Sequence, residues 1–395
     1  MSTLKVDGIR SNSATSDAIT LASDGTCTAN ITNNLSNRNK VINGAMQISQ
    51  RNTQVTGISS GGYYVCDRWR LGYGNAGIWT LSKSTDTPNN FGSSFKLDCT
   101  TASPSLSSTS NLQLLQCFEG QDLQDVEKGT STAKQITVSF YVKTNKTGTY
   151  IVELMDHDNS NRHCSQSYTV SNTNWNRYEL TFPADTTGTL DNDNAKSFEV
   201  GFWLAAGSMF QGTSLQTTWG TLNQGQRAVG QVNLADSTSN EWYITGVQLE
   251  VDHTGSGVAT DFEHRSFGQE LALCQRYCNV ITGDGSQGGN TSVGEIAISE
   301  NATLYNASSL YCSVPLKVSM RTKPSITVTT GTNYYIVYSN GVGTHVNGSG
   351  ISMNSNTGTE AIVLSHIGTS VGTGGHAAIF RTYNTNAKIT ISAEL

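Results

Sequence analysis

The feature that most constrains the fold is a strand, turn and helix pattern over residues 242–279, which separates two stretches rich in strand patterns. Tyr243, Val247, Leu249 and Val251 recur at even spacing, which predicts one apolar face of a β-strand. A turn rich in glycine and serine follows this strand. The pattern therefore predicts that one β unit closes here and a second begins beyond the helix.

The helix is predicted from its start signal and its apolar spacing. Ser266 followed three residues later by Gln269 is a capping-box pattern. Four residues at spacings of four, three and four predict the buried face of this helix: Phe267, Leu271, Cys274 and Cys278. A helix within one larger domain remains the alternative to a connecting helix.

Alternating apolar residues elsewhere predict strands rather than helices. Residues 135–143 alternate most clearly, and a Thr-Gly turn after them predicts a hairpin over 135–156. Charged residues make up 14% of the chain, against about 25% in an average protein, so the outer faces are polar without being charged. We expect an all-β protein with a jelly-roll-like β-sandwich.

The predicted organisation has four parts. They are an N-terminal arm at 1–40, a jelly-roll-like β-sandwich domain at 41–265, a short connecting helix at 266–279 and a C-terminal β-sandwich tip domain at 280–395. The arm has few apolar residues and cannot bury a core alone. Leu4, Val6 and Ile9 are therefore its candidate contacts, with copies of the chain in a trimer or with another protein; a flexible tail is the alternative.

Composition argues against several classes of function. The net charge is −6 and no run of Lys or Arg exists, so we expect no nucleic-acid binding. No stretch approaches about 20 apolar residues, so we expect no membrane insertion, and the N-terminus lacks the apolar core of a secretory signal. The eight cysteines show no disulfide framework, which favours buried free thiols in a chain folded in a cytoplasm.

Polar clusters offer few sites for chemistry. Residues 155–164 carry Asp and His without ligand spacing, and 191–196 resemble only half of a calcium loop, so we expect turns and no cofactor, with a structural calcium ion as the remaining alternative. The sequence lacks the common hydrolase, metalloprotease and nucleotide-binding motifs. We therefore expect no enzymatic activity.

Residues 67–69 predict a buried ion pair. Arg68 lies beside Trp69 and next to Asp67, which indicates an ion pair with Asp67 that is shielded by an indole.

Aromatic residues supply candidate contacts for sugars. Trp203 lies off the apolar face of its predicted strand, so it is the best candidate for an exposed platform that stacks on a sugar ring. The tyrosines Tyr334 and Tyr335 are the candidate glycan platform in the C-terminal domain.

Several segments resemble tailed-phage virion proteins, marine and cyanophage-like ones among them. ITGVQLEVDHTGSGVATDFEHRSFGQELALCQRYC resembles a segment that recurs in their tail-fibre or receptor-binding-type structural proteins. Two segments near the start of the predicted sandwich resemble motifs of the same family: NKVINGAMQISQRNT and Cys66–Trp69. A third segment, VPLKVSMRTKPSITVT, resembles a motif that is typical of tail-fibre C-terminal domains. The resemblance implies that Glu263, His264 and Arg265 brace the connection between strand and helix.

The resemblance implies a fibre protein of the virion, assembled in the host cytoplasm and exposed on the particle surface. It implies a homotrimer that joins other virion proteins through the arm and attaches to the host by multivalent, non-covalent binding of surface polysaccharide. A non-adhesive structural component, such as a head fibre, a decoration protein or a tail accessory protein, is the alternative. A polysaccharide depolymerase is a further alternative, which would require a cleft with paired carboxylates.

Overall fold

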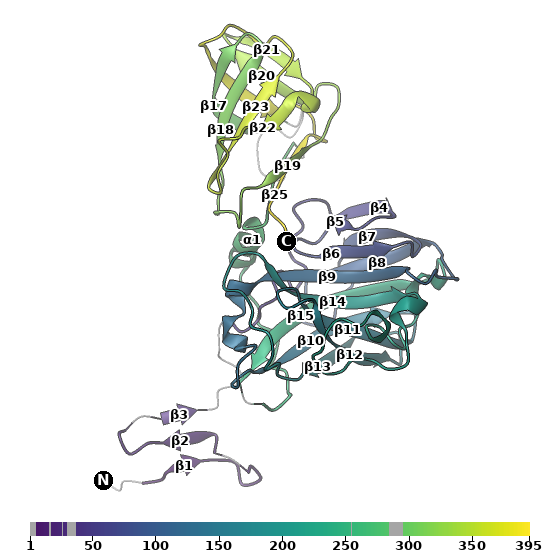
Figure 1. Ribbon diagram of the computed structural model, residues 1–395. Helices are drawn as coiled ribbons and strands as arrows, with labels where there is room; N and C mark the ends of the chain where they lie inside the picture. Colours follow the sequence, from purple (N-terminus) through teal and green to yellow (C-terminus); the bar gives the residue numbers. More distant parts are fainter. Residues whose placement is uncertain (1–4, 16, 26, 30–36, 254, 284–294) are drawn as a thin grey trace.

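The computed structural model describes residues 5–15, 17–25, 27–29, 37–253, 255–283 and 295–395. It confirms the all-β class, with one α-helix, α1 (Phe267–Gln275), among these residues (Figure 1). All strand pairings among the described residues are antiparallel. None of the helices in the described part of the chain is both long and apolar enough to cross a bilayer.

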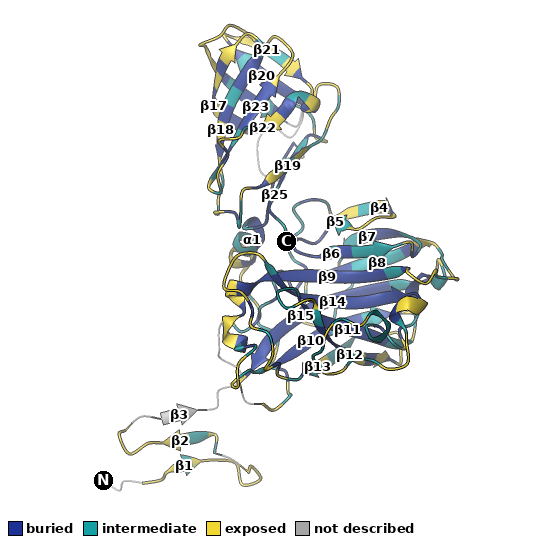
Figure 2. Ribbon diagram, viewed as in Figure 1, coloured by how far each residue is buried: buried dark blue, intermediate teal, exposed yellow. Residues whose placement is uncertain are grey.

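The middle of the chain forms a sandwich of two six-stranded sheets. The first sheet has the order β13 (Asn176–Phe182), β10 (Gln135–Thr144), β15 (Glu241–Asp252), β8 (Ser94–Thr101), β7 (Ile78–Ser84) and β4 (Gln54–Ile58). The second has the order β12 (Arg162–Val170), β11 (Gly148–Asp156), β14 (Lys196–Ala206), β9 (Asn111–Glu119), β6 (Arg70–Gly74) and β5 (Gly62–Tyr63). The inward faces of both sheets form one apolar core (Figure 2).

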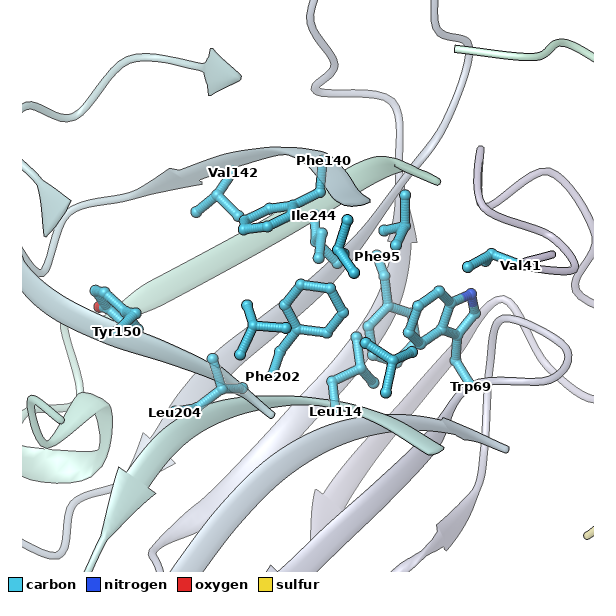
Figure 3. Packing of buried hydrophobic residues seen from close by; sticks show 14 of the residues in the cluster. Val41, Trp69, Phe95, Leu114, Phe140, Val142, Tyr150, Phe202, Leu204 and Ile244 are labelled. Atoms are coloured by element: carbon cyan, nitrogen blue, oxygen red, sulfur yellow. The ribbon is translucent and has the colours of Figure 1, made fainter. Parts of the chain in front are cut away.

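Aromatic side chains from both sheets meet in this core. Phe140 of β10 packs edge-on against Phe202 of β14, with ring centres 5.0 Å apart (Figure 3). Trp69, which directly precedes β6, also packs against Phe202, with ring centres 6.1 Å apart. Because the contact between Phe140 and Phe202 joins opposite sheets, burying these rings holds the two layers together.

The strand predicted over residues 135–143 is confirmed, but its predicted partner is wrong. The segment forms β10, and the following strand forms β11. Because β10 and β11 lie in different sheets, they do not form the predicted hairpin over 135–156. The turn between them crosses from one layer to the other. Local alternation specifies a strand and its buried face, but it does not specify the strand's partner.

A bulge in β15 corrects a second prediction. Gly246 has φ +62°, and the register between β10 and β15 shifts beside it. The extra residue reverses the alternation, so Ile244 and Val247 both point into the core while Tyr243 faces outward. The predicted apolar face therefore holds for Val247, Leu249 and Val251 but not for Tyr243.

The C-terminal unit contains two further sheets. The larger has the order β21 (Val342–Val346), β20 (Tyr335–Ser339), β24 (Ala377–Thr382), β17 (Ala297–Asn306), β18 (Ser309–Pro315), β23 (Ala361–Ile367) and β22 (Ile351–Met353). The smaller has the order β16 (Cys278–Thr282), β25 (Lys388–Ser392) and β19 (Ser325–Val328). Both contribute to a second apolar core, separate from the first.

The arm forms a small sheet of β1 (Gly8–Ile9), β2 (Ile19–Leu21) and β3 (Cys27–Ala29) that extends away from the sandwich (Figure 1). Val6 and Ile9 are 37% and 53% exposed, so neither is buried by this chain alone. Leu4, the third candidate contact, lies outside the described residues.

Helix α1 has the predicted start but only part of the predicted buried face. Ser266 and Gln269 form both hydrogen bonds of the capping box. Cys274 is buried, Leu271 is half-buried and Phe267 is 60% exposed, because the first turn extends beyond the surface on which the helix packs. Cys278 is buried in β16 rather than in the helix, which ends at Gln275. The seven described cysteines with placed side chains are free and buried, as predicted.

The segment before α1 binds the start of the sandwich. Both oxygens of Glu263 accept backbone N–H groups, from Asn37 at 2.6 Å and from Asn39 at 2.8 Å. Arg265 donates to the carbonyls of Asn39 and Val41. Glu263 and Arg265 thus brace this segment against the start of the sandwich, where the arm leaves it, whereas His264 packs against Phe91 and Phe262.

A buried cluster of four charged side chains and one tyrosine joins the C-terminal unit to the sandwich. We call these residues the junction cluster: Arg51, Asp67, Arg68, Tyr277 and Glu394. Arg68 pairs with Glu394, so its predicted pairing with Asp67 is wrong. Arg51 contacts both Asp67, at 3.8 Å, and Glu394, at 3.1 Å. The carboxylate of Glu394 thus contacts two arginines of the sandwich.

Candidate functional site

The outer face of the first sheet bears a small polar hollow of about 360 Å³. We call it the sandwich hollow; its lining residues are Lys143, Thr144, Asn145, Thr173, Asn174, Glu241 and Tyr243. Its size falls within the range of about 300–1,000 Å³ that is usual for ligand sites. It lies where β10 ends and β15 begins, close to the turn between β12 and β13.

Asparagine side chains shape the turn on one side of the hollow. The side chain of Asn172 accepts the N–H of Asn174 at 2.9 Å and the amide of Asn176 at 3.0 Å. Such Asx turns hold a short loop in one conformation. This loop presents Trp175, which is half-buried at the start of β13.

Trp175 is fixed beside the hollow by two contacts. Its indole N–H donates to Oδ1 of Asp86 at 2.9 Å. Its ring packs edge-on against Tyr243, with ring centres 6.2 Å apart and planes at 67°. An indole held in this way presents its remaining surface without losing further rotamer freedom when a ligand arrives.

Two lysines flank Tyr243 and pair with acidic residues. Lys143 Nζ lies 2.6 Å from Asp86, and Lys96 Nζ lies 2.8 Å from Glu241. The ammonium groups lie 5.7 Å and 5.3 Å from the centre of the Tyr243 ring, within cation–π range. Tyr243 is thereby 8% exposed and supports the charged groups instead of offering an open ring face.

Hydrogen bonds keep the acidic groups of the hollow ionised. Burial acts to raise the pKa of Asp86 and of Glu241, but bonds from Lys143 and Trp175 to Asp86, and from Lys96 and Tyr243 to Glu241, lower both. Burial, followed by the bond to Glu241, raises the pKa of Tyr243 to about 12. At neutral pH the hollow therefore presents fixed ammonium and carboxylate groups, which donate and accept hydrogen bonds in set directions.

The arrangement suits a ligand with apolar and hydroxyl-bearing surfaces. Lys143 and Glu241 are 33% and 40% exposed, so each keeps capacity for hydrogen bonds to a ligand. Asn174 and Thr173 are exposed and add an amide and a hydroxyl. Trp175 adds an aromatic surface beside them. A pyranose ring, with C–H faces and a rim of hydroxyl groups, matches such a set.

The sequence-predicted glycan residues do not form this site. Trp203 points away from the main core, as predicted, but it is fully buried under residues 207–231 with Phe210 and Ala228. Its indole donates to Glu153 at 3.1 Å. The prediction of an exposed Trp203 platform is wrong, because a strand pattern does not reveal a covering loop.

The two tyrosines of the C-terminal unit also differ from the prediction of a platform. Tyr335 is fully buried in the second core and donates its hydroxyl to the carbonyls of Thr329 and Lys388, at 3.1 and 3.0 Å. Tyr334 is half-buried against the same core. Neither residue lies near the sandwich hollow.

The sequence analysis did not name Trp175 as a ligand contact and assigned Tyr243 to the apolar face of its strand. In both cases the sequence contains a feature that indicates the observed position. Trp175 stands in SNTNWNRYEL, a polar turn immediately before a strand, where a large aromatic residue has no core to fill. Gly246 within a strand pattern is a recognised sign of a bulge, which would have turned Tyr243 outward.

The polar clusters weighed for metals are engaged in other contacts. Asp156 pairs with buried Lys128, and Asp158 accepts the N–H of Asp191 at 2.9 Å. Within the described residues, no group of three or more His, Cys, Asp or Glu side chains is arranged to hold a metal ion.

Comparison with known proteins gives no family. No protein-family model matches the chain, and no curated protein matches it. Among solved structures, the enzymatically active domain of tailspike protein 4 from bacteriophage CBA120 matches at 15% identity and TM-score 0.29, over 56% of this chain and 24% of that one. The chain thus spans about a quarter of that structure.

Two carbohydrate-binding modules also match. A family 11 module from Clostridium thermocellum, solved with a mixed-linked tetrasaccharide, has 11% identity and TM-score 0.26, over 53% of this chain and 98% of the module. A xylan-binding CBM22-1 domain from Paenibacillus barcinonensis has 7% identity and TM-score 0.26, over 50% and 91%. TM-scores this low carry no argument about this chain.

Proposed function

We propose that this chain is a phage virion fibre protein of the tail-fibre or receptor-binding type, which attaches to surface polysaccharide of the host cell. Binding is non-covalent, and the sandwich hollow makes the contact. The observation that carries this proposal is the fixed Trp175 indole beside the paired groups Lys143–Asp86 and Lys96–Glu241. The sequence resemblance of residues 244–277 supports a place on the virion.

Avidity is part of the proposal. A small hollow of this kind binds one or two sugar rings weakly, and repeated copies on one particle raise the effective affinity without new contacts. The exposed Val6 and Ile9 of the arm support a homotrimer, because three arms together can bury what one leaves exposed. The same arm is then the part that joins other virion proteins.

The experiment measures binding of polysaccharide extracted from host cells to the full chain and to Trp175→Ala. Trp219→Phe serves as the control, since Trp219 packs against the core. The proposal expects binding by the wild type and the control, and at least a tenfold loss for Trp175→Ala. Equal binding by all three proteins would move the contact away from the hollow.

Two other results would replace the proposal. A folded oligomer that binds no host polysaccharide would favour the non-adhesive structural role. Shortening of the polysaccharide during incubation, seen by size-exclusion chromatography, would favour the depolymerase instead of an adhesin without enzymatic activity.

A further inference from the structure

A second hollow, of about 550 Å³, lies on the C-terminal unit. We call it the C-terminal hollow. It is formed on the larger C-terminal sheet, over strands β20, β24 and β17, and its main lining side chains are Glu295, Glu300, Tyr338, Ala377, Ile379 and Arg381. It shares no residue with the sandwich hollow, which lies in the other unit.

The hollow has an apolar side. Ile379 of β24 pairs in register with Tyr338 of β20, so the two side chains lie next to each other on one sheet face. Both are half-buried, and the neighbouring Ala377 is exposed and small. Methyl groups and a tyrosine ring beside an alanine leave an apolar floor on which the C–H face of a sugar ring can rest.

The other side is polar and rigidly held. Arg381 donates Nε to Glu300 at 3.1 Å and Nη1 to Glu295 at 3.0 Å, and Nη2 also reaches Glu300, at 3.2 Å. The guanidinium lies 5.9 Å from the centre of the Tyr338 ring. Because two carboxylates and a ring hold it, the planar fork is already oriented before a ligand binds.

These polar groups keep free hydrogen-bonding capacity toward solvent. Glu300 is 47% exposed and Arg381 is 32% exposed. A carboxylate offers about four acceptor positions, and Arg381 fills only some of them. Burial, and then the charge of Glu295 and a hydrogen bond to it, raise the pKa of Tyr338, so its hydroxyl stays protonated at neutral pH and donates to Glu295. Two adjacent hydroxyls of one sugar can therefore bind at the same time, one donating to a carboxylate oxygen and the other accepting from the guanidinium.

The charge of the hollow restricts the ligand. Among the residues that the structure describes, two glutamates and one arginine line the hollow with a net charge of −1, and no lysine or second arginine lies with them. An acidic sugar such as a uronic acid would place a carboxylate beside Glu295 and Glu300, which is unfavourable at short range. A neutral sugar with adjacent free hydroxyls meets no such repulsion.

We infer that the C-terminal hollow is a second carbohydrate site, specific for neutral sugars and independent of the sandwich hollow. The inference rests on the proposed function for its class of ligand. The inference adds a separate site and a selectivity for neutral over acidic sugars. Each chain would then contact a polysaccharide at two places, one on each unit.

The test uses the full chain with methyl β-glucoside and with glucuronic acid as its methyl β-glycoside, which differ only in the charged group at C6. Saturation-transfer NMR reports total binding, whereas tryptophan emission reports binding at the sandwich hollow, because residues 280–395 contain no tryptophan.

The variants address the two sites separately. Trp175→Ala removes the first site. Ala377→Phe fills the second without removing a polar group, and Arg381→Lys keeps the charge but loses the planar fork. Glu360→Gln, an exposed position outside the hollow, is the control.

The expected result is that Trp175→Ala loses the emission change but keeps saturation transfer to methyl β-glucoside. Adding Ala377→Phe or Arg381→Lys should then reduce transfer at least fivefold, and adding Glu360→Gln should not. Transfer lost with Trp175→Ala alone would overturn the second site and leave the proposed function standing. Equal transfer to glucuronic acid in Trp175→Ala would overturn the selectivity. No transfer from the wild type to either sugar would overturn both the second site and sugar binding at the first.

Discussion

The guanidinium carbon of Arg68 lies 3.5 Å from the centre of the Tyr277 ring, and the same guanidinium pairs with Glu394. Arg68 belongs to the sandwich, Tyr277 follows α1 and Glu394 follows the last strand of the C-terminal unit. Three distant parts of the chain therefore meet at one buried cation. This contact ties the end of the chain to the sandwich and couples the two units that carry the hollows.

Breaking this contact on one side should destabilise the protein. Arg68→Met leaves Glu394 buried with one partner fewer, and loss of one partner of a buried pair costs about 3–5 kcal/mol. We expect a drop of that order in the free energy of unfolding, measured with urea. The double variant Arg68→Met/Glu394→Gln should recover part of the loss. The more solvent-exposed pair of Arg177 and Glu179, with side chains 26% and 34% exposed, is the control, where Arg177→Met should cost about 1 kcal/mol. A full loss in the double variant would contradict the account of the junction cluster.

Trp203 should matter for stability and not for ligand binding. It is fully buried and its indole is bonded to Glu153, so Trp203→Ala should cost roughly 3–5 kcal/mol of stability. Under conditions where the variant remains folded, binding of host polysaccharide should equal that of the wild type. Loss of binding with unchanged stability would restore Trp203 as a ligand contact.

Stability at low pH should depend on Glu199. Burial alone would raise the pKa of its carboxyl, but His157, whose Nε2 lies 3.7 Å from Glu199, and the hydrogen bond and charge of Lys196 outweigh burial and lower that pKa from 4.5 to about 2. A depressed folded-state pKa gives stability that is complete above pH 4.5 and is lost as the pH falls toward about 2. The free energy of unfolding of the wild type should exceed that of Glu199→Gln by on the order of 3 kcal/mol at pH 6. This difference should shrink below pH 4.5. A difference that grows on acidification would contradict the assignment.

The arm should control association. Removing residues 1–36 leaves the contacts of Asn37 and Asn39 with Glu263 in place but removes the exposed Val6 and Ile9. We expect a trimer for the full chain and a folded monomer for the shortened chain, measured by light scattering. The double variant Val6→Ser/Ile9→Ser tests the same contacts without truncation. A shortened chain that is still a trimer would move the interface to another part of the molecule.

Local patterns predicted individual elements well because the physics that forms those elements is local. Alternation over 135–143 predicted β10, and the Ser266–Gln269 pair predicted the start of α1. Both signals depend on residues within a few positions of each other.

What the sequence could not provide was long-range pairing. Arg68 and Glu394 are 326 positions apart, so reasoning from neighbouring residues could name only Asp67 as a partner for Arg68. The loop that covers Trp203 and the turn that presents Trp175 both lie outside the strand patterns, yet the loop packs Phe210 and Ala228 on the sheet and the turn borders a hollow. Tyr243 differs, because the glycine at position 246 was visible and its effect on the alternation was overlooked.

The most direct test of the central claim is binding of host surface polysaccharide to the full chain and to Trp175→Ala, with the chain length of the polysaccharide followed at the same time. The account predicts binding by the wild type, at least a tenfold weaker complex with the variant, and a polysaccharide of unchanged length. Absence of binding by a folded wild-type oligomer, or a shortened polysaccharide, would contradict it.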